Sequence, residues 1–208
     1  FWTAIPTGYF TIINPDQNGS SLLIGVSDYG PSDDNQTILY AYDGEQIVQV
    51  GVFEDIIGKN AWDISGAVCH GDGTITARIR FDILGTWNAL ARYRADSNAL
   101  TDITGFYSYI SWEGQQTGWE VTAKTDIIMY EDIQNAETQV IVPAGTPVSM
   151  TGMKKGSSDS TYWVCFAADS MGKTLWMTVE KIDWYSYVPT PNGLIISDDA
   201  FDGFFYAG

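Results

Sequence analysis

Hydrophobic and polar residues alternate with a period of two along much of the chain. Between residues 74 and 81, Thr and Arg occupy the even positions, and Ile, Ala and Phe occupy the odd ones. Successive side chains of a β-strand point to opposite faces, so this alternation predicts a half-buried strand. After a break at Gly85 the stretch 87–94 alternates again, which predicts a hairpin. Further strands are predicted at 22–27, 36–42, 47–53 and 106–112.

Strand signals continue in the second half at closer spacing. They are interrupted by a polar loop at 153–160. Five short strands in about 65 residues are typical of a small barrel. Two short helical turns are also predicted, at 53–59 and at 199–205. The strand-forming stretches are 121–130, 140–150, 162–167 and 175–179, and the second of them holds two strands because it crosses the turn Pro-Ala-Gly-Thr-Pro.

A faint repeat runs through the first half. Three residues recur 51 positions later, each time as the same or a similar residue. A unit of about 50 residues with about four strands suits a propeller blade or half of a sandwich. The repeated pairs are Ile24 with Ile75, Leu39 with Leu90, and Tyr42 with Tyr93.

Composition supports this architecture. Hydrophobic residues make up 45% of the 208 residues, enough for a packed core, and 14% aromatic residues with 21 Gly favour strands and turns. A Gly- and Gln-rich break at 114–118 predicts a boundary. We therefore predict an all-β protein: a two-repeat antiparallel β-domain at 1–115, a small β-barrel at 119–187, and a tail at 188–208 that packs back on the body.

The formal net charge of −16 limits the possible partners. Phosphate contacts require clustered Lys and Arg, so the charge excludes nucleic acid, and it disfavours anionic membrane surfaces. No apolar run is long enough to span a membrane. Because the chain begins at Phe1 without a leader, we expect a leader or anchor to have been removed, and an extracellular or surface-anchored location.

The two cysteines, Cys69 and Cys165, are too few for a metal pair or a disulfide framework. Both lie in apolar, strand-like stretches. We expect buried free thiols, and a single disulfide between the two halves is the alternative.

One loop has the spacing of a calcium site. Asn14, Asp16 and Asn18 place oxygen ligands at alternate positions before Gly19. A Ca²⁺ ion needs several oxygens converging from one tight loop. Leu22 stands where a final acidic ligand would be expected, and an Asx-rich turn without metal is the alternative.

No catalytic residue is predicted. His70 is the sole histidine and precedes the turn Gly71-Asp72-Gly73, which indicates a surface position. In an extended stretch its neighbour Cys69 points to the opposite face, which disfavours a Cys–His pair. Among 26 acidic residues no spacing singles out a carboxylate pair for glycoside hydrolysis.

Arginines gather on the predicted hairpin. Arg78 is expected about opposite Arg92 on one face, where like charges need nearby anions. The protein's own carboxylates are one source of those anions. The functional alternative is a docking face for an anionic ligand.

Residues 119–183 resemble a bacterial Src-homology-3-like (SH3b) domain. The matching stretches are 121–130, 142–148, Trp163-Val164 and 172–177, although Leu175 stands where the family usually has Gly before the late Trp. Residues 9–54 resemble an FG-GAP propeller-like blade. The segment 198–208 is similar to the ends of surface proteins of gut Firmicutes.

Related barrels present aromatic side chains in grooves, so the resemblance indicates where a ligand would bind. Strand alternation places Tyr162 and Trp163 on opposite faces, and one of the two is therefore expected in the core. Stacking on sugars or peptides is the functional interpretation, and core packing is the alternative. The candidate residues are Tyr130, Tyr162, Trp163 and Trp176.

These observations predict a monomeric, non-catalytic, extracytoplasmic binding or adhesion module without a required cofactor. The barrel resemblance implies cell-wall peptide, glycan or a surface protein as the partner. A structural spacer within a larger surface protein is the first alternative, and a hydrolase is the second.

Overall fold

The computed structural model describes residues 9–14, 16, 22–28, 30, 35–42, 44–57, 66–111 and 117–206. Strands account for 63% of the structure and helix for 6%, which confirms the predicted all-β class. The paired strands are antiparallel, and those in the described ranges do not close into a barrel, so the small barrel predicted at 119–187 is an open sheet instead. Over the same ranges, no helix reaches the length and apolarity of a membrane span.

The chain divides into two compact units. One is drawn from Phe1–Arg80 and Leu90–Thr104, and the other from Phe81–Ala89 and Gly105–Gly208. The division passes through two adjacent long strands, β6 (Thr74–Asp82) and β7 (Thr86–Ala95). Most of the predicted break at 114–118 lies outside the described residues, so the predicted domain boundaries stay a prediction.

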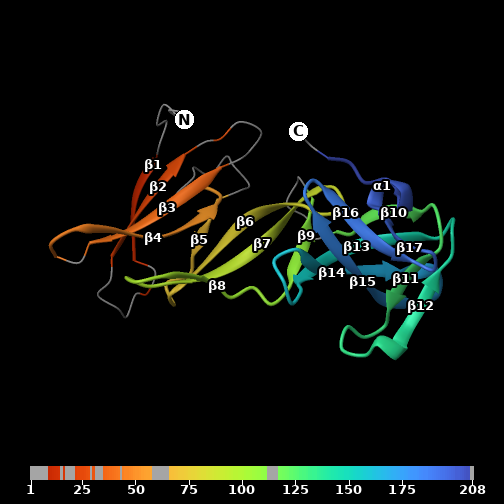
Figure 1. The fold of residues 1–208 in the computed structure, drawn as a ribbon. Coiled ribbons are helices and arrows are strands. Elements are labelled where there is room, and N and C mark those ends of the chain that lie inside the picture. The colour runs from red at the N-terminus through yellow and green to blue at the C-terminus, as the bar shows by residue number, and fades with distance from the viewer. Residues whose placement is uncertain are drawn as a thin grey trace. The chain divides into compact units, whose positions relative to one another are not determined.

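A four-stranded meander forms most of the first unit, with the order β1-β2-β3-β4 (Figure 1). Its buried face carries Leu23, Leu39 and Phe53, at alternate positions of three strands. The sequence predicted three of the four strands to within one residue. The strands are β1 (Tyr9–Ile13), β2 (Leu23–Asp28), β3 (Gln36–Tyr42) and β4 (Ile47–Glu54).

The first unit also contains short strands beside β6 and β7. β5 (Val68–Cys69) pairs with β6, and β8 (Leu100–Asp102) pairs with β7. The ring of Tyr93 on β7 lies 5.8 Å from that of Phe53 on β4, measured between centroids. Aromatic packing therefore joins the meander to β7 within this unit.

The second unit is one curled antiparallel sheet. Its main path is β12-β11-β15-β14-β13-β9, while β10 pairs with β13 and the hairpin β16–β17 pairs with β15 (Figure 1). Two 3-10 turns, η2 (Ala136–Thr138) and η3 (Asp169–Met171), connect strands. The elements are β9 (Tyr107–Ile110), β10 (Trp119–Ala123), β11 (Ile127–Tyr130), β12 (Gln139–Val142), β13 (Pro147–Lys155), β14 (Thr161–Ala168), β15 (Lys173–Ile182), β16 (Tyr185–Thr190), β17 (Gly193–Ile196), α1 (Ser197–Ala200) and β18 (Phe201–Asp202).

Alternate residues of the central strands form the core of this unit. Phe166 of β14 is fully buried, and its ring stacks on that of Phe201 with centroids 5.9 Å apart. β18, which contains Phe201, pairs with β10. The C-terminal segment thus contributes to the core. Further fully buried side chains of β13, β14 and β15 include Met150, Met153, Val164, Leu175, Met177 and Val179.

Several predicted elements are wrong in detail. The stretch 121–130 is two strands, because a turn at 124–126 separates β10 from β11. The first predicted helix fails, since Phe53 and Glu54 lie in β4 and Ile57 forms a β-bridge. At the second, α1 spans only Ser197–Ala200 before β18 begins.

Both thiols are free in the structure. Cys165 on β14 is 4% exposed, whereas Cys69 on β5 is half-buried. Burial raises the pKa of both thiols, and at Cys165 a hydrogen bond from Thr151 and the charge of Lys154 partly oppose it.

This difference in burial predicts selective labelling. We expect a thiol reagent at neutral pH to modify Cys69 in the folded protein and Cys165 only after unfolding, since modification requires access as well as thiolate. Absorbance of the released chromophore in native buffer and in urea measures this. Equal reaction rates of the two thiols in native buffer would contradict the structure.

Candidate ligand-binding face

Strand pairing brings two candidate tryptophans to the outward side of the second unit's sheet. Across β14 and β15, Trp163 lies opposite Thr178, and Trp176 lies opposite Cys165. Val164 and Phe166, which alternate with Trp163, point into the core and are fully buried. Both tryptophans are half-buried, so part of each indole faces solvent.

Tyr130 joins them from a distant part of the sequence. β11 pairs with β15 so that Tyr130 stands opposite Trp176. The Tyr130 ring meets the Trp163 ring edge to face, with centroids 5.7 Å apart and an interplanar angle of 77°. Three of the four predicted aromatic residues therefore share one surface.

Two further side chains complete this surface, and the sequence analysis did not include them. The Phe106 ring meets the Trp176 ring at 76° with a centroid distance of 5.9 Å. Lys154 Nζ lies 5.3 Å from the centroid of the Trp176 ring, within the range of a cation–π contact. We call Phe106, Tyr130, Lys154, Trp163 and Trp176 the aromatic face.

The hairpin formed by β15 and β16 has an exposed tip next to this side of β15. Ile182, at the end of β15, pairs with Tyr185, and they are 50% and 54% exposed. Between them Trp184 is 86% exposed, and Asp183 adopts a left-handed φ of 54° in the tight turn. Such exposure of a tryptophan is uncommon, because its large apolar surface is usually covered.

The sequence around this hairpin contains an alternating stretch and a turn motif that would have predicted it. Tyr185 and Tyr187 alternate with the buried Ser186 and Val188, as in a half-buried strand. The turn Pro191-Asn192-Gly193 follows, and turn residues of this type separate hairpin strands. Gly193 has a φ of 114°, which glycine adopts without strain.

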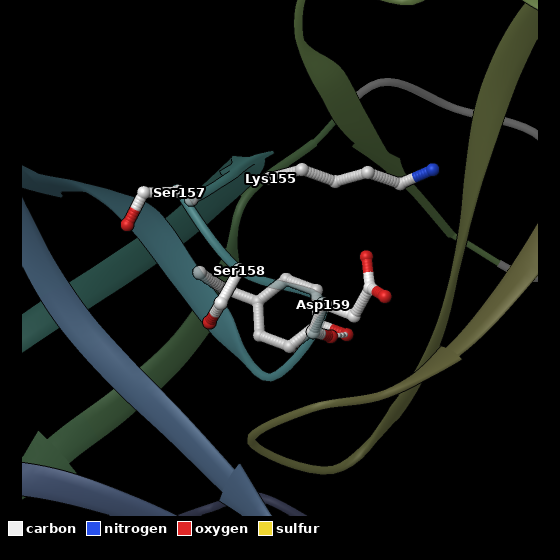
Figure 2. Close-up of a pocket in the computed structure, with 6 residues that line it drawn as sticks. Lys155, Ser157, Ser158 and Asp159 are labelled. Atoms are coloured by element: carbon white, nitrogen blue, oxygen red, sulfur yellow. Dashed lines mark hydrogen bonds between the residues drawn. The ribbon is translucent and has the colours of Figure 1, made fainter.

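Tyr162 stands apart from the aromatic face. It occupies the core-side position of β14 near the strand end, where it is half-buried like Trp163, so neither of the two is the core residue that the sequence predicted. Its hydroxyl donates a hydrogen bond of 2.8 Å to the carbonyl oxygen of Asp159. With the β13–β14 loop it lines an open pocket of about 400 Å³ (Figure 2). The other lining residues are Lys155, Gly156, Ser157, Ser158 and Asp159.

The two candidate arginines, Arg78 and Arg92, belong to the first unit, and each contacts a carboxylate of that unit. The backbone N–H of Arg78 donates to Asp55 Oδ2 at 2.8 Å, and burial lowers the pKa of the Arg78 guanidinium. Arg92 Nη2 lies 3.5 Å from Asp72 Oδ2. The hydroxyl of Thr74, followed by the charge of Arg92, helps to lower the pKa of the Asp72 carboxyl. Arg92 therefore has the internal counter-anion that the sequence analysis gave as one alternative.

The predicted calcium loop is described in part. Asn14 is exposed, Asp16 forms an isolated backbone bridge with Asp72, and Asn18 lies outside the described residues. Over the part of the chain that the structure describes, no group of three His, Cys, Asp or Glu side chains is placed to hold a metal ion.

His70 lies at the surface, as its position before a turn predicted. Its side chain is exposed, and Nε2 is 2.8 Å from the hydroxyl oxygen of Thr76. A hydroxyl partner on the neighbouring strand neither activates nor orients the imidazole as a carboxylate would.

Comparison with known proteins gives no match. No family model, no curated protein and no solved structure matches the chain.

Proposed function

We propose that this protein is a non-catalytic extracytoplasmic binding module, and that its aromatic face contacts cell-wall glycan or peptide. The observation that carries this proposal is the group of half-buried rings on the outward side of the second unit's sheet, with Trp163 and Trp176 at its centre. The exposed Trp184 lies in the turn between β15 and β16.

The chemistry of this surface suits a ligand that is part apolar and part polar. Indole and phenol rings offer flat apolar area at low entropic cost, and such residues dominate binding energy in interfaces. Lys154 supplies a cation for a ligand carboxylate, while Thr178 and Glu180 offer hydrogen-bonding groups on the same side of β15. Sugar rings and peptide side chains both fit this combination.

Two sequence features support the location and the ligand class. Residues 119–183 resemble bacterial SH3-like domains, whose expected partners are cell-wall peptides and glycans. The net charge of −16 agrees with a soluble protein outside the cell and disfavours nucleic acid as a partner. A structural spacer would expose an evenly polar surface, which the exposed aromatic side chains do not favour.

Binding to purified bacterial cell wall tests the proposal. We expect the protein to sediment with insoluble peptidoglycan, and Trp163→Ala and Trp184→Ala each to weaken binding at least about tenfold, because exposed aromatic anchors contribute most of such affinities. Tyr206→Ala is the control: Tyr206 is 42% exposed in the C-terminal segment, and its hydroxyl contacts Ser197. Trp184→Ala should leave the melting temperature unchanged, since its side chain packs against little.

The same preparation separates the alternatives. The proposal predicts no release of soluble fragments from the cell wall during incubation, whereas a hydrolase would release them. Failure to sediment, or equal binding by all three variants, would argue against the aromatic face as the binding surface.

A further inference from the structure

The meander of the first unit is apolar on both faces. One face is its core, with Leu23, Leu39 and Phe53 buried. On the other face, the side chains at the sheet's margins are strongly exposed although they are large and apolar. Their exposed fractions are 67% for Phe10, 65% for Ile12, 57% for Leu22, 62% for Tyr42, 64% for Ile47 and 44% for Val52.

Strand register makes this second face continuous. Phe10 pairs with Val26, Val26 with Ile38, and Ile38 with Val52, so one apolar row crosses all four strands. A second row joins Ile12, Ile24 and Tyr40 and ends at Gln49 on β4. The four central residues of these rows are half-buried. Neither row contains a charged residue. We call this surface the outer meander face.

The size of the outer meander face exceeds what a monomer usually exposes. An aromatic side chain carries about 200 Å² and an aliphatic one somewhat less, so the exposed fractions amount to roughly 700 Å² of apolar surface. The largest apolar patch on a typical monomer is about 300–600 Å². A stable protein interface buries about 800 Å² on each partner.

We propose that the outer meander face is a homodimer interface, in which two copies of this chain pack sheet on sheet about a two-fold axis. A glycan would need several converging hydrogen-bonding groups, whereas the two rows offer only the Tyr40 hydroxyl and the Gln49 amide, and anionic lipid is disfavoured by the charge of −16. A flat apolar sheet face is complementary to itself, and sheets pack face to face in this way in sandwiches. The available area matches what each partner of a dimer contributes.

The placement of acids on the meander is compatible with this symmetry. Asp28 and Glu54 both stand opposite Gln36, in one row at one end of the sheet. A two-fold axis perpendicular to the strands reverses their direction in the second copy. The acidic end of each copy then lies over the other copy's opposite end, and the central contact is apolar.

Sedimentation equilibrium of the full 208-residue chain tests the proposal. We expect a concentration-dependent mass of twice 22.9 kDa for the wild type. The double variant Phe10→Lys with Ile12→Lys is expected to raise the dissociation constant at least about 100-fold, because it places four charges in the interface. Both side chains are exposed in the single chain, so the variant should keep its circular dichroism spectrum and melting behaviour.

Leu194→Lys is the matched control, a 52% exposed apolar residue of β17 in the second unit, and it should leave the dimer intact. A wild type that stays monomeric at all concentrations would overturn the proposal, and would indicate that another segment or a foreign protein covers this face. A dimer that persists unchanged in the double variant would overturn it as well.

Discussion

Replacing Asp55 with Asn is expected to lower the free energy of unfolding of the first unit by about 2–4 kcal/mol. Asp55 is 7% exposed, and its two carboxylate oxygens accept separate backbone hydrogen bonds of 2.8 Å. The donors are the N–H groups of Ile56 and Arg78, so this side chain joins the end of β4 to β6. The Asn amide has the same size and keeps one acceptor oxygen, which can satisfy one of these two N–H groups. Its NH₂ group faces the other N–H, and because both are donors, neither of them finds an acceptor.

The backbone of Asp55 is part of the same junction. Its N–H donates to the carbonyl of Asn35 at 3.0 Å, and its carbonyl accepts from the Thr37 hydroxyl at 2.7 Å. Its φ is 104°, a conformation that a non-glycine residue adopts only when its surroundings enforce it. The hydrogen bonds of Asp55 therefore hold this backbone conformation in place, and the Asn variant weakens that hold.

Asp96→Asn provides the control for this measurement. Asp96 also accepts two backbone N–H bonds, from Asn98 at 2.7 Å and Ala99 at 3.0 Å, but in an exposed turn. Both bonds end on Oδ1, an acceptor that Asn keeps, and water reaches this exposed turn, so the cost should stay below about 1 kcal/mol. Urea unfolding followed by circular dichroism measures both variants. Equal costs for the two would refute a structural role for Asp55.

Gly152→Ala is expected to destabilise the second unit by about 1–3 kcal/mol and to disturb the aromatic face. A Cβ at this position would lie 2.3 Å from the carbonyl oxygen of Tyr107 and 2.7 Å from the Phe106 ring. The φ of Gly152 is 153°, and the β13–β14 register shifts between Met150 and Gly152. β9 approaches β13 at this bulge, and the Phe106 ring there reaches Trp176 because Gly152 has no side chain.

Amide hydrogen exchange distinguishes this clash from ordinary turn strain. We expect the β9 amides to exchange faster in Gly152→Ala, because the added methyl separates β9 from β13. Gly145→Ala is the control: its φ is 83°, and nothing lies within 4 Å of the added methyl, so it has a strain cost without a clash. Unchanged β9 exchange in Gly152→Ala would contradict the close contact.

Local patterning in the sequence was sufficient for most strands of the meander. The stretch 36–42 coincides with β3, because alternating side chains face a core on one side. The same pattern did not show that the second side is apolar as well. Ile24, Val26, Ile38 and Tyr40 are individually ordinary strand residues, and their alignment into rows depends on the register between strands.

Where local signals were weak, the predictions failed. The turn Lys124-Thr125-Asp126 contains neither Gly nor Pro, so β10 and β11 were predicted as one strand. Acidic residues at 198–199 suggested a longer helix, but Phe201 is buried against Phe166 and its strand pairs with β10. Tertiary packing therefore limits α1 to one turn.

The sequence predicted only part of the candidate site, because some of its contacts depend on strand pairing that no local pattern shows. Residue type and the barrel resemblance selected Trp163 and Trp176 as candidates, and strand parity placed Tyr162 and Trp163 on opposite faces. The contact of Tyr130 with Trp163 depends on the pairing of β11 with β15, which are far apart in sequence. Phe106 and Trp184 were missed, because a strand-edge residue and a hairpin tip have no periodic signal of their own.

The most direct test of the proposed function is the indole N–H region of an NMR spectrum during titration with soluble peptidoglycan fragments. We expect the signals of Trp163, Trp176 and Trp184 to shift with a common saturation curve. The signals of Trp87 and Trp119 should stay fixed, because their indoles donate to the carbonyls of Ile83 and Gly203 within the protein. Unmoved signals from the first three residues at saturating fragment, or shifts confined to the other two, would contradict it.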